Sequence, residues 1–323
     1  MGRGLANDVN GAYPRNDGSV GQLPMKEGKP QYNVYNTDAA WGAQWNLSQL
    51  WTLAYPEYMS EYVSSHIQAY KDAGWLADGL ANNRYVSGVG TNLLSTIIAG
   101  AYQCGIRDFD TKLAYEACLK NKLDGKDRPF GAGKVNTAEF VKYGYVPHQD
   151  QGEGYHETFM FSASHTLEYS YSAWAVAQWA KSLGDTENYD KLMNLSKGWE
   201  RLYDTSCNFI RPKKADGKFV DNFNPMEVWR GFQEGNAWQY TFYVPHDVKG
   251  LVAKVGTEEF NARLDSIFTQ SQKKIFSGGT EVGAFAGLET LYNHGNQPAC
   301  IFHGCLTKLA IRNLPRNGTR HPE

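Results

Sequence analysis

Apolar residues recur at steps of three and four along most of this chain, and this spacing is what most restricts its fold. One run ends at Gly74 and carries Met59, Tyr62, Val63, Ile67 and Tyr70. Residues at these steps share one face of an α-helix, and glycine commonly follows a helix C-terminus. Alternating patterns, which are typical of half-buried strands, are scarce. The sequence therefore predicts an all-α fold.

The same pattern predicts further helices in neighbouring pairs. Asp110 stands where an N-terminal cap is needed, and another helix is expected to start at Asp185. The helices are expected over residues 93–105, after Asp110, over 166–184, over 185–203, and from Thr257 onward. Two loops, at about residues 144–165 and 204–234, are longer than simple connections need. Long loops at one end of a helical array commonly build the functional site.

Charge and hydropathy exclude several classes of partner. The chain has 32 Lys and Arg against 34 Asp and Glu, a formal net charge of −2, so no nucleic-acid partner is expected. No apolar run approaches the roughly 18 to 20 residues that a membrane helix needs, so no membrane span is expected. The first eleven residues lack the apolar core of a signal peptide.

Aromatic residues make up 14% of the chain, which suits a sugar-binding cleft as well as a large aromatic core. A flat ring can cover the C–H face of a pyranose while its polar edge stays in water. The most concentrated segment is Trp229–Asp247, in which Glu234 lies between Phe232 and Trp238. Apolar surroundings raise the pKa of a carboxyl group, as a general acid near neutral pH requires. The alternative is that Glu234 is a solvated surface acid.

Two other polar clusters remain open to more than one interpretation. Glu168 stands in the first turn of a helix that otherwise looks buried, where it could simply complement the helix dipole. The segment Tyr292–Pro298 offers oxygen and nitrogen ligands, although an ordinary Asx turn explains it nearly as well. Phosphate-binding loops, zinc-hydrolase motifs and nucleophile elbows are absent from the sequence.

Five stretches then occur in a fixed order: Tyr35–Trp45, Ala101–Asp110, Thr166–Tyr169, Glu234–Tyr240 with Pro245–Asp247, and His294–Pro298. Together they resemble the catalytic domain of glycoside hydrolase family 92, a family of calcium-dependent exo-acting α-mannosidases. The resemblance covers residues 1–298. It implies a helical (α/α) barrel that normally follows a β-sandwich domain, and hydrolysis of mannose-containing glycans, α-1,2-linked ones in particular, with inversion at the anomeric carbon.

The resemblance also implies roles for individual residues. Glu234 matches the glutamate that donates a proton to the glycosidic oxygen, while an aspartate far downstream activates water on the opposite face. Calcium would be held by Asn296 and Gln297, because it is a hard cation that prefers oxygen ligands. The expected sugar contacts are Asp38, Trp41, Glu168, Trp238, His246, Asp247, His294 and Gln297.

The chain departs from the family pattern in three places. The β-sandwich is missing from the sequence as given. Because the family continues through further helices after Pro298, we expect an incomplete barrel of helical hairpins over residues 1–298, from a parent protein that is exported. Trp41 precedes Gly42 where the family most often has aspartate, and Asp38 is expected to compensate. Residues 299–323 contain four basic residues, one acidic residue and two of the five Cys, as a frameshifted tail would, and nothing in them matches the motif of the catalytic base.

Three hypotheses follow from the sequence. The chain is a fragment of an exo-α-mannosidase, or a non-catalytic carbohydrate-binding or non-functional product that lacks the base. The third hypothesis is another helical-barrel carbohydrate enzyme, a lyase or an epimerase.

Overall fold

The structure of this protein, a computed structural model, describes residues 4–37, 40–152, 154, 157–275, 287–293, 295–296 and 298. Most of them are helical. The helices are α1 (Ala40–Gln44), α2 (Leu47–Ala54), α3 (Pro56–Ala73), α4 (Leu94–Gln103), α5 (Thr111–Leu123), α6 (Thr137–Tyr143), the 3-10 helix η1 (Glu157–Phe161), α7 (Ser162–Leu183), α8 (Thr186–Leu195), α9 (Gly198–Leu202), α10 (Ala237–Tyr240), α11 (Val248–Val255) and α12 (Thr257–Ile275).

Short strands pair in four two-stranded antiparallel sheets within the described residues. They are β1 (Ala12–Pro14) with β2 (Val20–Gln22), β3 (Met25–Lys26) with β4 (Lys29–Pro30), β5 (Gly79–Ala81) with β6 (Arg84–Val86), and β7 (Tyr203–Asp204) with β8 (Phe209–Ile210). The prediction of a mainly helical chain is confirmed. The all-α prediction missed these hairpins because strands of two or three residues are too short to show an alternating pattern.

The predicted helix ends are confirmed where cap chemistry is local. Gly74 and Gly184 follow α3 and α7 in the left-handed conformation, with φ of +78° and +72°, which costs glycine little. Asp110 accepts a hydrogen bond from the Leu113 N–H (3.0 Å), and Asp185 accepts one from the Asn188 N–H (3.2 Å). Each aspartate thereby satisfies an otherwise unpaired donor in the first turn of α5 or α8.

Two predicted boundaries were wrong. The helix expected from residue 166 begins at Ser162, so Glu168 lies beyond its first turn and the helix dipole does not explain it. The helix expected over 185–203 is divided into α8 and α9. At the division, Gly198 packs so closely on α7 that an added Cβ would lie 2.6 Å from the Ser170 hydroxyl oxygen, a contact that periodicity along one helix does not reveal.

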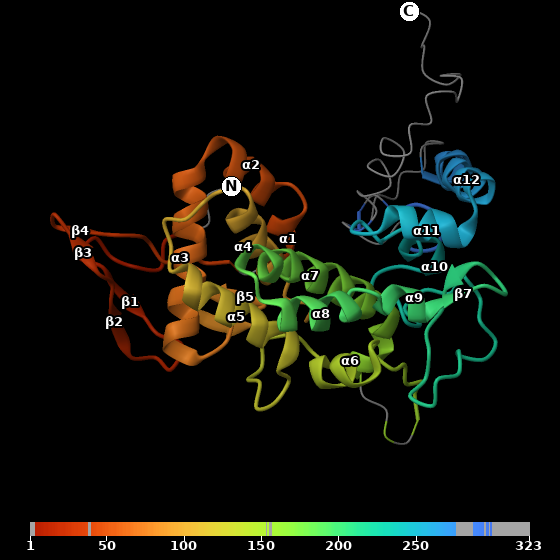
Figure 1. Cartoon of the computed structure of the whole chain (residues 1–323), viewed down its shortest axis with the longest axis horizontal. Helices are drawn as coiled ribbons and strands as arrows, with labels where there is room; N and C mark the ends of the chain where they lie inside the picture. Colours follow the sequence, from red (N-terminus) through yellow and green to blue (C-terminus); the bar gives the residue numbers. More distant parts are fainter. Residues whose placement is uncertain are drawn as a thin grey trace, which may run out of the picture.

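Helix α7 runs through the middle of the molecule, between the N-terminal helices α1–α5 and the C-terminal helices α9–α12 (Figure 1). It contributes to two hydrophobic cores. Tyr169, Ala173 and Trp179 pack in the first core with α3, α4 and α5, whereas Ala163 and Leu167 pack in the second with α10, α11 and α12. Glu168 therefore sits where the two cores meet.

Several predictions fall on residues outside the described part of the chain. These are Asp38, His294, Gln297 and the tail 299–323. Within the described part, no helix is both long enough and apolar enough to cross a bilayer.

Candidate active site

A small cavity lies at the meeting point of the two cores; the space between its walls, including the part that is open to solvent, is about 310 Å³. Its walls come from α1, the segment before α4, α7, the loop before α10, and the segment after α12. They are formed by Trp41, Trp45, Val89, Leu93, Glu168, Gln233, Glu234, Tyr240, Asn296 and Pro298. Four residues predicted for the site, Trp41, Glu168, Glu234 and Asn296, are thus brought together.

Glu234 is held in this cavity by a strained and well-anchored loop. Its φ is +54°, a conformation that non-glycine residues seldom adopt and that concentrates at functional sites. Its carbonyl oxygen accepts a hydrogen bond from Asn296 Nδ2 (2.9 Å), and the preceding carbonyl, of Gln233, accepts one from the Tyr240 hydroxyl (2.6 Å). Glu234 is half-buried, and this burial raises the pKa of its carboxyl group.

Glu168 supplies the cavity with a second and more deeply buried carboxyl group. It is 7% exposed, and its Oε2 atom has no hydrogen-bond partner among the described residues. Burial raises the pKa of Glu168 to about 7, although the nearby charge of Lys134 acts in the opposite direction. A buried oxygen without a partner is costly, so this atom is a natural contact for a polar ligand.

Two tryptophan rings complete the walls. The ring of Trp41 lies so close to Gly88 that a Cβ atom at that glycine would be 1.7 Å from Trp41 Cη2. Trp45 Nε1 is buried and finds no hydrogen-bond acceptor among the described residues. The cavity therefore combines aromatic surface with an unpaired donor on Trp45 and an unpaired acceptor on Glu168, a combination that suits a pyranose ring.

The oxygen atoms around the cavity are of the type that calcium prefers. Asn296 is buried, and its Nδ2 atom donates to the Glu234 carbonyl and lies 3.3 Å from the Tyr240 hydroxyl. This orientation leaves Oδ1 of Asn296 as the atom that could coordinate a cation, in the cavity that Glu168 also lines. The donor set present here fits a hard cation, although no group of three His, Cys, Asp or Glu side chains in the described residues forms a metal site.

Three other predicted residues lie outside this cavity and have structural contacts. Trp238 packs edge-on against Phe209, with ring centroids 5.1 Å apart. His246 Nε2 pairs with the Ser196 carbonyl at 2.9 Å, and burial lowers its pKa to about 4. Asp247 is the N-cap of α11, where it accepts a hydrogen bond from the Gly250 N–H (3.0 Å).

Six residues of the cavity were not predicted as site residues, and one of them, Pro298, ends the motif His294–Pro298. Gln233, Tyr240 and Trp45 belong to, or directly precede, the motifs described above, so an analysis of their neighbours could have found them. Val89 and Leu93 carry no chemical signal in the sequence, because apolar wall residues resemble any other core residue. The structure alone places them in the site.

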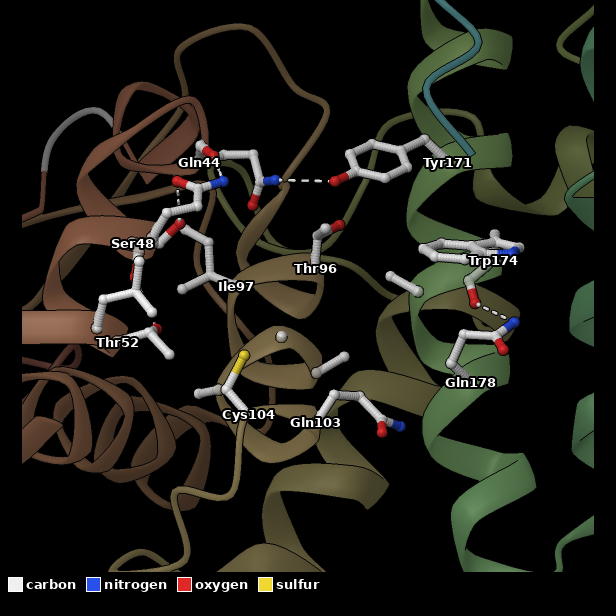
Figure 2. A pocket seen from close by; sticks show the side chains of 16 residues that line it. Gln44, Ser48, Thr52, Thr96, Ile97, Gln103, Cys104, Tyr171, Trp174 and Gln178 are labelled. Carbon is white, nitrogen blue, oxygen red and sulfur yellow. Dashed lines mark hydrogen bonds between the residues drawn. The ribbon is translucent and has the colours of Figure 1, made fainter. Parts of the chain in front are cut away.

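A larger pocket, with about 880 Å³ of unfilled space, lies between α1, α2, α4 and α7 (Figure 2). Gln44 bridges its two sides by donating a hydrogen bond to the Tyr171 hydroxyl (3.2 Å). None of the described residues that line it carries a carboxyl group. The smaller cavity, in contrast, contains the carboxyl groups of Glu168 and Glu234, which general acid–base chemistry can use.

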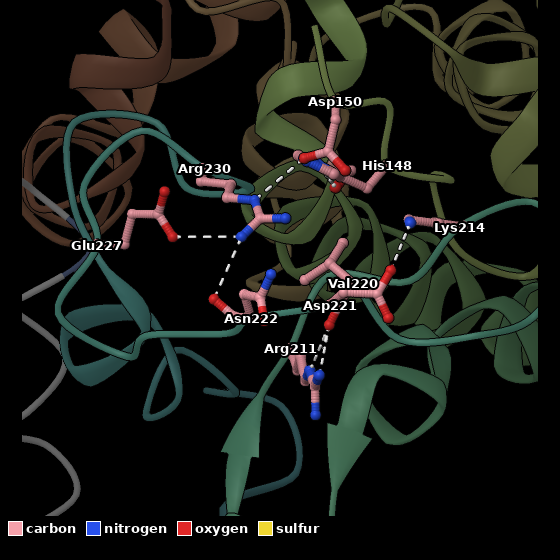
Figure 3. A network of polar contacts seen from close by, with 10 residues as sticks. His148, Asp150, Arg211, Lys214, Val220, Asp221, Asn222, Glu227 and Arg230 are labelled. Carbon is pink, nitrogen blue, oxygen red and sulfur yellow. Dashed lines mark hydrogen bonds and ion pairs between the residues drawn. The ribbon is translucent and has the colours of Figure 1, made fainter.

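The two long loops predicted from the sequence meet in a polar network (Figure 3). Arg230 Nε pairs with Asp150 Oδ1 at 3.1 Å, and Arg230 Nη1 pairs with Glu227 Oε2 at 3.4 Å. Nearby, the Trp229 N–H donates to the Gly235 carbonyl (3.2 Å). These contacts anchor the loop that carries Glu234 to the loop before α7.

Comparisons with known proteins agree with this arrangement. A protein described as an uncharacterized secreted glycosidase of Arthroderma benhamiae is 29% identical over 282 residues, which are 77% of this chain and 34% of that protein. An inverting family GH92 mannosidase of Bacteroides thetaiotaomicron superposes with a TM-score of 0.71 at 26% identity, over 91% of this chain and 39% of that structure.

A second structure from Bacteroides thetaiotaomicron, a family GH92 alpha-mannosidase in complex with mannoimidazole, shares the fold. Its TM-score is 0.75 at 23% identity, over 94% of this chain and 38% of that one. The chain thus spans less than two-fifths of the length of each relative. The model of the glycosyl hydrolase family 92 catalytic domain matches residues 1–303. This chain belongs to glycosyl hydrolase family 92.

Proposed function

We propose that this chain is part of an exo-acting α-mannosidase that hydrolyses mannose-containing glycans, α-1,2-linked ones in particular, with inversion at the anomeric carbon. The observation that carries this proposal is the cavity itself. It joins a half-buried carboxyl group on Glu234, a buried one on Glu168, and the ring of Trp41. The similarity to an inverting mannosidase supports the same reaction.

Glu234 acts as the general acid. Its raised pKa keeps a larger fraction of the carboxyl group protonated near neutral pH, so it can donate a proton to the glycosidic oxygen as the bond to the leaving group breaks. The hydrogen bonds from Asn296 and Tyr240 fix the backbone on both sides of the Gln233–Glu234 peptide. This anchoring limits the movement of the acid relative to the sugar.

Glu168 and Trp41 bind the sugar. The unpaired Oε2 of Glu168 accepts a hydrogen bond from a hydroxyl group, and the Trp41 ring packs against a C–H face. Asp38, His294 and Gln297 are proposed as further sugar contacts from the family resemblance. Trp238, His246 and Asp247 are not proposed as direct sugar contacts, because their side chains contact other parts of the protein.

Asn296, through Oδ1, and Gln297 are proposed as calcium ligands. When bound, calcium would supply a hard positive charge that orients the sugar hydroxyl groups and favours a distorted ring. The chain's own contribution is to keep Oδ1 of Asn296 turned away from the Glu234 carbonyl, to which Nδ2 is already bonded.

The catalytic base is assigned to no residue of this chain. We propose that it belongs to another part of a longer, exported protein, in which residues 1–298 form one portion of an (α/α) barrel and residues 299–323 are an atypical tail. The secreted glycosidase that resembles this chain supports export.

The test measures mannose released from an α-1,2-mannobioside by the 323-residue chain and by the full-length protein, with calcium or with a chelator. We expect release by the full-length protein only with calcium, and a loss of about 100- to 10,000-fold in kcat for Glu234→Gln. Glu258→Gln is the control, because Glu258 is exposed in α12 and lies outside the segment that carries Glu234. An unimpaired Glu234→Gln variant, or release without calcium, would refute the proposal.

A further inference from the structure

A loop, residues Gly88–Asn92, contributes to the wall of the cavity that also contains Glu234. Val89 of this loop lines the cavity, and Gly88 is in contact with the ring of Trp41. Gly90 and Asn92 have φ of +73° and +42°. Glycine adopts this conformation freely, but a non-glycine residue such as Asn92 keeps it only where surrounding contacts hold it, so the position of this wall depends on whatever anchors the loop.

The main anchor is the carboxylate of Asp78, which is 1% exposed and does not line the cavity. Its Oδ2 atom accepts hydrogen bonds from the N–H groups of Gly88 (2.8 Å) and Gly90 (3.0 Å). Its Oδ1 atom accepts one from the N–H group of Asn92 (3.0 Å). One side chain thus satisfies three backbone donors of the loop, and charge-assisted hydrogen bonds of this kind are the stronger ones.

A second anchor reaches the loop from its other side. Lys134 Nζ, which is also buried, donates to the carbonyl oxygens of Asn92 (2.9 Å) and Thr91. The Tyr169 hydroxyl lies 3.2 Å from the Gly90 carbonyl oxygen. Tyr169 directly follows Glu168 in α7, so the hydrogen bond from Tyr169 connects the loop to the helix that carries the second carboxyl group of the cavity.

From this geometry we infer that Asp78 is a positioning residue for the sugar-binding cavity: it holds the Gly88–Asn92 loop, and through Gly88 it sets the position of the Trp41 ring. Only the identity of the ligand, a sugar, rests on the proposed function. Asp78 does not line the cavity, so it would act through the loop and not by contacting the sugar. Gly88 has the complementary role, because its missing side chain leaves the space that the Trp41 ring occupies.

Two variants separate this role from a general loss of stability. Asp78→Asn keeps the size of the side chain but replaces one acceptor oxygen by a donor, which then faces an N–H group of the loop. Gly88→Ala leaves the hydrogen bonds in place and adds a methyl group at the Trp41 ring; the conformation of Gly88 is not in the left-handed region. Gly100→Ala, in α4, is the matched control, since an added Cβ there meets nothing within 4 Å.

The first readout is independent of any sugar. The full 323-residue chain, which has nine Trp, is labelled with 5-fluorotryptophan, and Trp41→Phe assigns the Trp41 signal in the ¹⁹F NMR spectrum. We expect Asp78→Asn and Gly88→Ala to move the Trp41 signal and to leave that of Trp199, which lies in the second core, in place. A Trp41 signal that stays in place in both variants would overturn the inference, whether or not the protein binds sugar.

The second readout is the affinity for methyl α-mannoside in the presence of calcium, measured by calorimetry. Both variants should weaken binding by about tenfold or more, since a misplacement of about 1 Å can cost on the order of 100-fold. In a Trp41→Ala background, Gly88→Ala should have no further effect, because its effect passes through that ring. A wild-type chain that binds no methyl α-mannoside would count against the proposed function, whereas the positioning role of Asp78 would still be decided by the ¹⁹F NMR spectrum. An equal effect of Gly88→Ala in both backgrounds would overturn the role of Gly88.

Discussion

Replacing Glu168 by Gln should make the folded protein more stable at neutral pH and weaken its binding of sugar. Burial raises the pKa of Glu168 from its ordinary value of 4.5 to about 7 in the folded protein. Between these two values the unfolded chain has released its proton while the folded protein still retains it. The contribution of Glu168 to the free energy of unfolding is therefore highest below pH 4.5, falls as the pH rises, and becomes constant above about 7.

The size of this effect follows from the difference between the two pKa values, about 2.5 (7 − 4.5). At 1.36 kcal/mol for each pKa unit, the contribution of Glu168 to the free energy of unfolding is about 3 kcal/mol lower at pH 7.5 than at pH 4. Gln has nearly the same size and does not ionise, so this loss should be absent in Glu168→Gln. The difference in unfolding free energy between variant and wild type should grow by about 3 kcal/mol over that interval.

The assay is urea unfolding followed by circular dichroism at pH 4, 6 and 7.5 in calcium-free buffer. The series ends at pH 7.5 because the pKa of Lys134, lowered to about 8 by burial, lies just above it. Glu187→Gln is the surface control, since the side chain of Glu187 is 78% exposed in α8. A difference between Glu168→Gln and wild type that does not change with pH would refute the reasoning, because it would mean that Glu168 is solvated.

The same variant should bind methyl α-mannoside about 10- to 100-fold more weakly, since a hydrogen bond to a charged group is worth roughly 1.5 to 3 kcal/mol. A gain in stability together with a loss of binding is what a strained functional residue produces. A purely structural residue would not weaken binding in a more stable protein. Unchanged affinity would therefore remove Glu168 from the sugar site.

Asp247→Ala should lower the free energy of unfolding by about 1 kcal/mol, because it removes the N-cap of α11. It should leave the affinity for methyl α-mannoside unchanged, and a weaker affinity in calorimetry would show that Asp247 contributes to sugar binding. Asn296→Ala should lower the free energy of unfolding by about 1 to 3 kcal/mol, because the Glu234 carbonyl loses its 2.9 Å hydrogen-bond partner. The same variant should bind calcium more weakly in a calorimetric titration, and an unaltered calcium affinity would contradict the role of Asn296 as a ligand. Mannose release by the full-length protein should decline as the pH rises and Glu234 loses its proton. Because the pKa of Glu234 is raised, this decline should lie closer to neutral pH than for an ordinary glutamate. A value of kcat/KM that stays constant into alkaline solution would exclude Glu234 as the acid.

Local features of the chain were sufficient for most of the helical structure. The glycines that end α3 and α7 and the aspartates that begin α5 and α8 act over a single turn of helix, so their effect can be recognised in a short stretch of sequence. The same is true of Glu234, whose apolar neighbours predicted the raised pKa that its burial produces.

Side-chain direction and long-range packing could not be predicted in this way. His246 and Asp247 follow closely after Glu234 in the chain, yet they turn toward the end of α8 and the start of α11, because each finds a hydrogen-bond partner there. Glu168 looked like an ordinary residue of a first helical turn until the earlier start of α7 placed it between the two cores. Asp78 and Gly88 gave no chemical signal at all, since their importance depends on three backbone N–H groups and one indole ring.

The amino-acid sequence thus determined the helical character of this protein, its family, and the residue proposed as its acid, because periodicity, caps and motifs are short-range properties. Only the tertiary structure brought Trp41, Glu168, Glu234 and Asn296 to one cavity. These residues are separated along the chain by tens of positions. Their proximity is decided by how α7 packs between the two cores, which no single segment specifies.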